Sequence, residues 1–268
     1  MDESKHTRTS GSQNNFIQNE PIILIFIRKS YLYIVKFGWM KSAKIEKSTF
    51  DFLDKLKNNN NREWFAEHKE LYISEHLKMI AFADDVLEEM RTHDHIETVS
   101  GKASLHRIYK DTRFSKDKTP YKNNWSASFR RATKENRGGY YLHIEKGNTF
   151  IAGGFFSPNK EDLLRIRQDI DINHEEWTTL LQQKDTIQTF GKLRGSQLAT
   201  APKGFEKDHP AIHLLRYKQF ILEHYFTDKE VFDPNFSKNV SESFKKLRPF
   251  FDLMSEILTT DLNGESIL

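Results

Sequence analysis

Residues 140–156 have the sequence YYLHIEKGNTFIAGGFF, which gives the clearest indication of the fold. Its two halves are rich in aromatic and β-branched residues, which is typical of β-strands. The polar segment 146–148, Lys-Gly-Asn, separates the halves and has the composition of a hairpin turn. We therefore predict an antiparallel hairpin with strands at 140–145 and 149–156. The pair Gly153-Gly154 predicts a bulge or a close backbone approach in the second strand.

The same richness in aromatic and β-branched residues extends from this hairpin toward the N-terminus. Residues 105–110, LHRIYK, and residues 125–129, WSASF, are also predicted strands, the second because large and small side chains alternate. Helical spacing of apolar residues precedes and follows this block. The sequence therefore predicts an α+β fold, with a central antiparallel sheet of about four strands and helices before and after it.

The helices are predicted from apolar residues that recur at steps of three and four. Ser48 or Thr49 is expected to cap the first helix, and Ser48 with Asp51 has the spacing of a capping box. A long pattern over residues 64–90 predicts a second helix with a bend or break near residues 74–76. After the sheet, helices are expected at about 158–170, 177–181, 209–226 and 239–258.

The amino-acid composition limits the classes of protein to which this chain can belong. Large apolar residues are frequent among the 268, which indicates a buried core and excludes global disorder. The absence of cysteine excludes disulfides, cysteine-based zinc sites, iron–sulfur clusters and thiol catalysis. A reducing, cytoplasmic compartment fits this composition. The chain contains no Gly-rich phosphate loop and no His-Glu-x-x-His motif, so we predict no metal site, and the cofactor is unknown.

The N-terminal region differs from the rest. Its unbroken apolar run, residues 22–27, has six residues, whereas a membrane helix needs about twenty. A polar stretch of mixed charge precedes that run, which a secretory signal would not show. We therefore expect no contact with a membrane. Residues 22–35 could form an extra edge strand or surface segment, but we predict that residues 1–39 are an extension upstream of Met40. Residues 40–268 would then form a single α+β domain.

Positive charge is concentrated in residues 101–137. This segment contains eleven Lys and Arg against three Asp and Glu, a local net charge of +8, whereas the whole chain carries +3. Basic side chains among aromatic ones suit a phosphate-bearing ligand with a stacking ring. A charge run is equally a common feature of a solvated face. The candidate ligand-binding residues are Arg107, Lys110, Arg113 and Lys118 for phosphate, and Tyr121 and Trp125 for stacking.

Two carboxylates interrupt the basic segment. We expect Asp111 and Asp117 to offset the repulsion among the cations and to hold Arg113 and Lys118 in place before a ligand arrives. Arg131 lies at the end of a predicted strand and is expected to be solvated. Arg113 is therefore expected to matter more for ligand binding than Arg131.

Residues 107–122, RIYKDTRFSKDKTPYK, resemble the signature Arg-x-x-Arg-Asp-x-Arg-Phe followed by Asp-Lys and Tyr. That signature belongs to an uncharacterised family of bacteria and some fungi, catalogued as domain of unknown function number twenty-four sixty-one. Lys110 stands where the family usually has Arg, which weakens a bidentate role there. The resemblance covers about residues 48–252 and implies no activity. Similar pieces are also found at 52–65, 140–141, 153–155 and 202–210.

A weaker candidate site is the sequence Asp208-His209-Pro210. Asp208 is a natural helix cap and Pro210 fits a first helical turn. Alternatively, Asp208 could orient His209 for acid–base chemistry. A third interpretation pairs His209 with His213 on a metal, since residues four apart share a helix face.

Three function hypotheses follow. The first is a binding module for an anionic, phosphate-bearing ligand, either a nucleotide or a nucleic acid. The second is an enzyme that acts on a phosphorylated or carboxylated substrate, with Asp111 or His209 as the base. The third is a protein-interaction module whose basic segment meets an acidic partner.

Overall fold

The computed structural model describes residues 22–24, 34–36, 43–261 and 264–268. Contacts divide the chain into two compact units, residues 1–41 and 42–268. In the first unit, β1 (Ile22–Leu24) pairs antiparallel with β2 (Ile34–Lys36). Met40 lies outside the described residues. The expected N-terminal extension and single domain therefore stay predictions.

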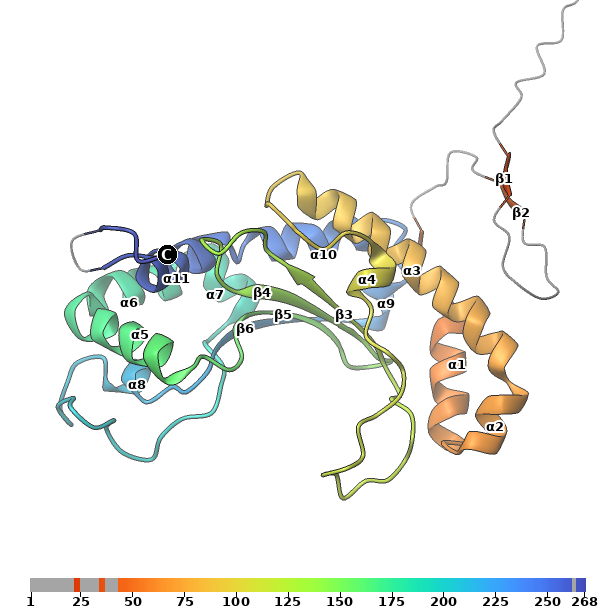
Figure 1. The fold of residues 1–268 in the computed structure, drawn as a ribbon, viewed down its shortest axis with the longest axis horizontal. Coiled ribbons are helices and arrows are strands. Elements are labelled where there is room, and N and C mark those ends of the chain that lie inside the picture. The colour runs from red at the N-terminus through yellow and green to blue at the C-terminus, as the bar shows by residue number, and fades with distance from the viewer. Residues whose placement is uncertain (1–21, 25–33, 37–42, 262–263) are drawn as a thin grey trace, which may run out of the picture. The chain divides into compact units, whose positions relative to one another are not determined.

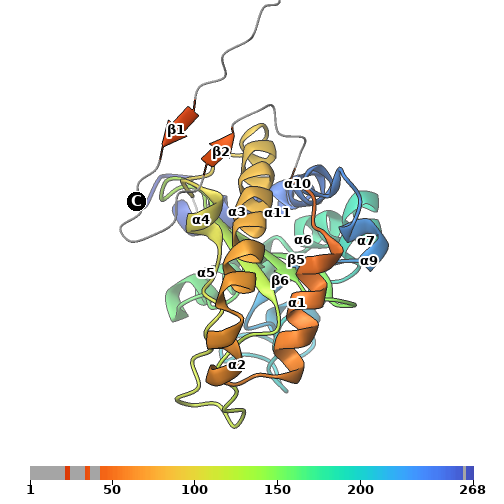
Figure 2. The same cartoon turned by 90° about the vertical axis from the view of Figure 1, so that its right-hand side faces the viewer.

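The second unit begins with helices that lie side by side (Figure 2). They are α1 (Lys47–Asn58), α2 (Arg62–Glu67), α3 (Lys69–Arg91) and the short α4 (Gly101–Ser104). The helical break predicted near residues 74–76 lies instead at His68, and the Asn61 side chain caps α2. The predicted capping box at Ser48 is wrong, because α1 begins before it. Thr49 donates to Glu75 at 2.9 Å in the buried interior.

Four antiparallel strands form the central sheet in the order β3-β4-β5-β6 (Figure 1). The strands are β3 (Trp125–Arg130), β4 (Gly139–Ile144), β5 (Thr149–Phe155) and β6 (Phe220–Phe226). The predicted hairpin is confirmed, since β4 and β5 flank a turn in which Gly147 has a φ of +70°. The close approach predicted at Gly154 is also confirmed. A Cβ at this residue would collide with the carbonyl oxygen of Phe220 on β6.

Two strand predictions require correction. Residues 105–110 form no strand, because only Leu105 and Tyr109 make isolated bridges. The fourth strand is β6, which lies inside the helix predicted over residues 209–226. That helix is reduced to α8 (Ile212–Leu215). The apolar residues of β6 satisfy helical and strand spacing alike, and pairing with the distant β5 decides for the strand.

Helices follow the hairpin and β6, as predicted for an α+β fold. They are α5 (Lys160–Ile172), α6 (His174–Gln182) and α7 (Lys184–Phe190) before β6, and α9 (Asp228–Val231), α10 (Phe236–Lys245) and α11 (Arg248–Thr259) after it.

The hydrophobic core lies between one face of the sheet and α3, α10 and α11 (Figure 1). Tyr140 packs against Phe244 of α10 and Phe251 of α11 at 4.9 Å between ring centroids in both cases. Trp125 stacks on Tyr72 of α3 with ring centroids 5.7 Å apart. Among the described residues, no helix is long and apolar enough to cross a membrane.

Candidate functional site

Residues 105–124 of the basic segment form a loop between α4 and β3 in which several cations are already engaged. Arg113 Nη2 contacts Asp111 Oδ2 at 2.6 Å, as expected. Asp117 pairs with Lys110 at 2.7 Å rather than with Lys118, whose ammonium donates to the carbonyl oxygen of Thr112 at 2.9 Å. Hydrogen bonds from Arg113 and Lys110 hold the pKa values of Asp111 and Asp117 below their usual range.

The two predicted stacking residues of this segment belong to the core. Trp125 is 1% exposed and stacks on both Tyr72 and Phe52. Tyr121 is 4% exposed, and its ring lies 4.1 Å from that of Phe65. Neither ring offers a free face to a ligand, so their predicted stacking role is wrong. The backbone of this region still lines a hollow, bordered by Arg62, Glu63, Tyr109, Lys110, Lys118 and Tyr121.

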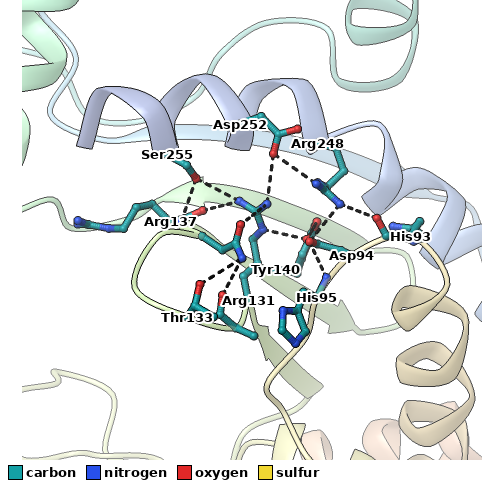
Figure 3. A network of polar contacts seen from close by, with 12 residues as sticks. His93, Asp94, His95, Arg131, Thr133, Arg137, Tyr140, Arg248, Asp252 and Ser255 are labelled. Carbon is teal, nitrogen blue, oxygen red and sulfur yellow. Dashed lines mark hydrogen bonds and ion pairs between the residues drawn. The ribbon is translucent and has the colours of Figure 1, made fainter. Parts of the chain in front are cut away.

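Arg131 contradicts the expectation that it is solvated. Its side chain is completely buried just after β3, where Nε donates to Asp94 Oδ2 at 2.9 Å (Figure 3). Nη1 donates to the carbonyl oxygen of Arg137 at 2.9 Å, and Nη2 contacts Asp252 Oδ1 at 3.3 Å. The guanidinium also lies 5.2 Å from the ring centroid of Phe251. All three nitrogens of Arg131 are therefore engaged.

Asp94 lies at the centre of this network, in the turn after α3. Its Oδ1 accepts from the amide of His95 at 2.8 Å and contacts Arg248 Nη1 at 3.1 Å. Its Oδ2 accepts from Tyr140 as well as from Arg131. Burial and then the hydrogen bond to Asp94 raise the pKa of Tyr140 far above its usual range. The network joins the sheet to α11, and within the described part of the chain only Arg248 Nε and His93 Nδ1 among its buried side-chain nitrogens have no hydrogen-bond partner.

Asp111 and His209, the two candidate bases, lie in different parts of the second unit. Asp111 belongs to the loop before β3, whereas His209 lies near α5 and α6. His209 Nε2 is 3.5 Å from Asp171 Oδ1, and Nδ1 accepts from the amide of Ala211. The N-cap of α8 is Ala211, so capping by Asp208 is wrong. No cluster with metal-binding composition occurs in the part of the chain that the structure describes.

The face of the sheet opposite the core carries a continuous row of side chains. Strand register places Ser126 of β3, His143 of β4, Phe150 of β5 and Tyr225 of β6 directly opposite one another in turn. The rings of His143 and Phe150 stack at 4.7 Å, and those of Phe150 and Tyr225 lie 5.2 Å apart. We call His143, Phe150 and Tyr225 the aromatic row. Tyr225 is 51% exposed, so the row is accessible at its β6 end.

A hollow of about 480 Å³ lies beside the aromatic row. Tyr141 and Phe156 line it with Ser128 and Arg130, and Gly139 and Gly154 leave its floor without side chains. Pockets that hold small ligands typically measure about 300–1,000 Å³. The hollow is therefore large enough for one nucleobase or a similar ring.

Three polar residues of β4 and the following turn form a chain of hydrogen bonds on this face. Tyr141 Oη lies 3.3 Å from His143 Nδ1, and His143 Nε2 lies 3.1 Å from Glu145 Oε2. We call these residues the relay. Burial would raise the pKa of Glu145, but hydrogen bonds from Asn148 and His143 outweigh it and lower that pKa. Burial raises the pKa of Tyr141. Glu145 is therefore a carboxylate and Tyr141 a neutral phenol near neutral pH.

A second histidine and two cations flank the β3 edge of the same face. His106 lies over β3, with its ring nitrogens 3.3 Å from Ser126 Oγ and 3.0 Å from Ser128 Oγ. Burial and the charge of Lys122 lower the pKa of His106, and burial and the charge of Arg107 lower that of Lys122. Within the described residues, neither Arg107 nor Lys122 forms an ion pair with a carboxylate.

Of the residues predicted to bind a ligand, Arg107 lies near enough to Lys122 to lower its pKa. Neither the relay nor the aromatic row was predicted from the sequence, although a signal existed for the relay. Tyr141, His143 and Glu145 alternate with Leu142 and Ile144, which places all three on the side away from the core.

Comparison with known proteins yields one match, to a family model. The model described as "Conserved hypothetical protein (DUF2461)" matches residues 48–253. No curated protein and no solved structure matches the chain. The matched span includes the basic loop, the whole sheet and both histidines of the open face. Because it covers more than half of the chain, this protein belongs to the DUF2461 family.

Proposed function

We propose that the open face of the sheet binds a nucleotide or a single-stranded nucleic acid. In this proposal, bases stack on the aromatic row and in the hollow beside Tyr141, while Arg107 and Lys122 contact phosphates. The observation that carries the proposal is the row of His143, Phe150 and Tyr225 across three adjacent strands, which is exposed at Tyr225. Every base has a π-face, so such a row accepts bases without regard to sequence.

The charges near this face support the same class of ligand. Arg107 lowers the pKa of Lys122 by charge repulsion, and Lys122 forms no ion pair with a carboxylate in the described part of the chain. An incoming phosphate would relieve that repulsion. By contrast, Lys110 and Arg113 of the exposed loop are already paired with Asp117 and Asp111. We therefore favour the sheet face over the loop as the primary site, with Lys118 as a peripheral contact. A ligand of this class fits the cytoplasmic location expected from the sequence.

The salt dependence of binding tests the role of the cations. A fluorescently labelled single-stranded oligonucleotide is titrated with the full chain at several salt concentrations, and the logarithm of the affinity is plotted against that of the salt concentration. Each phosphate contact with single strands contributes about 0.7 to the slope. Lys122→Ala should therefore reduce the slope by about 0.7, while Lys184→Ala, a substitution on the exposed surface of α7, should leave it unchanged.

Two outcomes would favour the other hypotheses. Equal losses of affinity in Lys122→Ala and Lys184→Ala would indicate diffuse electrostatic attraction and contradict a defined site. Binding to acidic proteins but to no oligonucleotide or nucleotide would favour the protein-interaction module.

A further inference from the structure

We propose that copies of this protein associate head to tail, with the tip of the basic loop of one copy inserted between α6 and α11 of the next. The tip carries Phe114 among basic side chains, and the receiving surface is a partly apolar hollow bordered by carboxylates. Neither surface shares a residue with the aromatic row. The inference therefore goes beyond the proposed binding of a nucleotide or nucleic acid and does not depend on it.

The chain from Tyr109 to Tyr121 forms an internally bonded arm, which is closed at its base by an antiparallel bridge between these two residues. The Asn60 side chain fixes this base to the turn before α2. It accepts from the Tyr121 amide at 3.0 Å and donates to the Tyr121 carbonyl oxygen at 2.9 Å. Nearer the tip, the Lys118 ammonium donates to the carbonyl oxygen of Thr112 at 2.9 Å. Because the arm is preorganised, little conformational entropy is lost when it binds a partner.

Phe114 lies at the tip of the arm and is 96% exposed. The guanidinium carbon of Arg113 lies 5.9 Å from the centroid of its ring. Arg113 pairs with Asp111 inside the arm, whereas Lys116 is exposed and forms no ion pair in the described part of the chain. An aromatic anchor beside cations, held on a preorganised arm, suits insertion into an apolar pocket with an acidic border.

An open hollow of about 410 Å³ between α6 and α11 has this character. Its lining includes the apolar side chains of Leu180, Pro249 and Leu253 and the carboxylates of Glu176 and Glu256. A cavity of about 150 Å³ can hold a benzene molecule. The hollow therefore has room for a phenyl ring.

The charges of the arm and of the hollow are complementary. Asp252 in the lining already contacts Arg131, but Glu176 and Glu256 are exposed and form no ion pair among the described residues. The whole chain carries +3 and residues 101–137 carry +8, so the rest of the chain carries −5. Each copy thus offers both a cationic arm and an acidic surface that can receive one. We therefore favour a second copy over an unrelated acidic protein as the partner.

The arm and the hollow lie far apart in the second unit, the arm on the side of α2 and the hollow beside α6 (Figure 1). A contact between them therefore joins two copies rather than two parts of one copy. Because two different surfaces meet, the copies form either a ring or an open chain. Each contact involves one ring and a few charges, so association should be weak and should weaken further as salt screens the charges.

Sedimentation velocity of the full chain over a range of protein concentrations tests the association. We expect the mean mass to increase with protein concentration and the dissociation constant to increase with salt. Phe114→Ala should raise that constant by about 10- to 150-fold, because it removes the burial of one phenyl ring. Val99→Ala is the matched control, since Val99 is 77% exposed outside the arm and the hollow, and it should associate as the wild type does.

Charge reversal distinguishes a defined contact from diffuse attraction. Lys116→Glu on the arm and Glu256→Lys at the hollow should each weaken association by about 10-fold or more, because like charges then meet. A mixture of these two variants should associate again, since the intact arm of one fits the intact hollow of the other. Lys229→Glu, a reversal on the exposed surface of α9, should leave association unchanged.

A wild type that stays monomeric at every concentration up to about 1 mM overturns the inference. Unchanged association in Phe114→Ala also overturns it, as does a mixture of Lys116→Glu and Glu256→Lys that associates no better than either variant alone. A loss of oligonucleotide binding in Phe114→Ala without a change in association would instead assign the tip to the nucleic acid. The first three results leave the proposed binding face intact, because that face is tested by oligonucleotide titration and not by association.

Discussion

Asp94 Oδ2 accepts a hydrogen bond from Arg131 Nε at 2.9 Å, and both side chains are shut off from solvent. The pair joins the turn after α3 to the end of β3 across 37 positions of sequence. Through Asp252 and Arg248 it also joins the sheet to α11. It lies on the side of the sheet away from the aromatic row, so we expect its substitution to affect stability more than the proposed binding face.

Substitution of Arg131 should be strongly destabilising. Arg131→Met leaves Asp94 buried without its main partner, and breaking a buried pair from one side costs about 3–5 kcal/mol. The neighbouring Arg130 is the matched control, because its side chain is 79% exposed and pairs only with Glu97. Chemical denaturation of both variants measures the difference. Similar free energies of unfolding for Arg130→Met and Arg131→Met would contradict the structural role of the pair.

Gly154 is predicted to be required for the pairing of β5 with β6. Its φ of +143° is a region that L side chains rarely adopt, and a Cβ would collide with the carbonyl oxygen of Phe220. Gly154→Ala should cost at least the roughly 1–3 kcal/mol of backbone strain, with the collision in addition. Gly147→Asn is the control, since Gly147 has a φ of +70° in open space and Asn tolerates that conformation. Equal melting temperatures for Gly154→Ala and Gly147→Asn would contradict the requirement for glycine at residue 154.

Stability should fall on mild acidification because partial burial lowers the pKa values of three histidines. Burial lowers the pKa values of His76, His93 and His106 below the usual 6.5. Between the folded and unfolded pKa values the unfolded chain binds more protons, so stability is complete above about pH 6.5 and decreases as the pH falls through the folded pKa values. The carboxylates with lowered pKa values lose their contribution only at more acidic pH, below their usual values near 4.

His76→Phe should weaken this pH dependence. The ring stacks on Tyr72 and Trp125, and Phe keeps that stacking without titrating. Free energies of unfolding measured between about pH 6.5 and pH 5 should therefore change less steeply in the variant than in the wild type. An identical pH slope in both proteins would show that His76 does not contribute.

Residues 1–39 are predicted to be dispensable for folding of the rest. The family match begins at residue 48, and contacts divide the chain between residues 41 and 42. A chain without residues 1–39 should melt cooperatively at an unchanged midpoint. A large fall in that midpoint would place the N-terminal segment in the core and contradict the prediction.

The sequence was most informative where signals were local. The hairpin of β4 and β5 was predictable because two β-rich segments flank Lys-Gly-Asn, and α1 was predictable from helical spacing. β6 was mistaken for a helix because its partner strand lies about 70 residues earlier, and that pairing has no local signature. Arg131 was mistaken for a surface residue for the same reason, since Asp94 is remote in sequence.

The candidate site shows the same limit. The concentration of positive charge predicted a site in the loop with Asp111, Arg113 and Lys118. In the structure Arg113 pairs with Asp111, and Lys118 donates to a backbone carbonyl of the same loop. The relay could have been predicted from the sequence, because Tyr141, His143 and Glu145 alternate along one strand and the residue that follows it. The aromatic row could not have been predicted, because it depends on the register of three strands. One of these, β6, is a strand only because it pairs with the distant β5.

The most direct test of the proposed binding face compares two tyrosines of equal exposure. Tyr225 on the aromatic row is 51% exposed, and Tyr109 in the basic loop is 50% exposed. Loss of one stacked base costs about 1–3 kcal/mol, so Tyr225→Ala should weaken binding of a single-stranded oligonucleotide by about 5- to 150-fold. We expect Tyr109→Ala to bind nearly as well as the wild type. A loss of affinity in Tyr109→Ala with none in Tyr225→Ala would contradict the account and place the ligand on the loop.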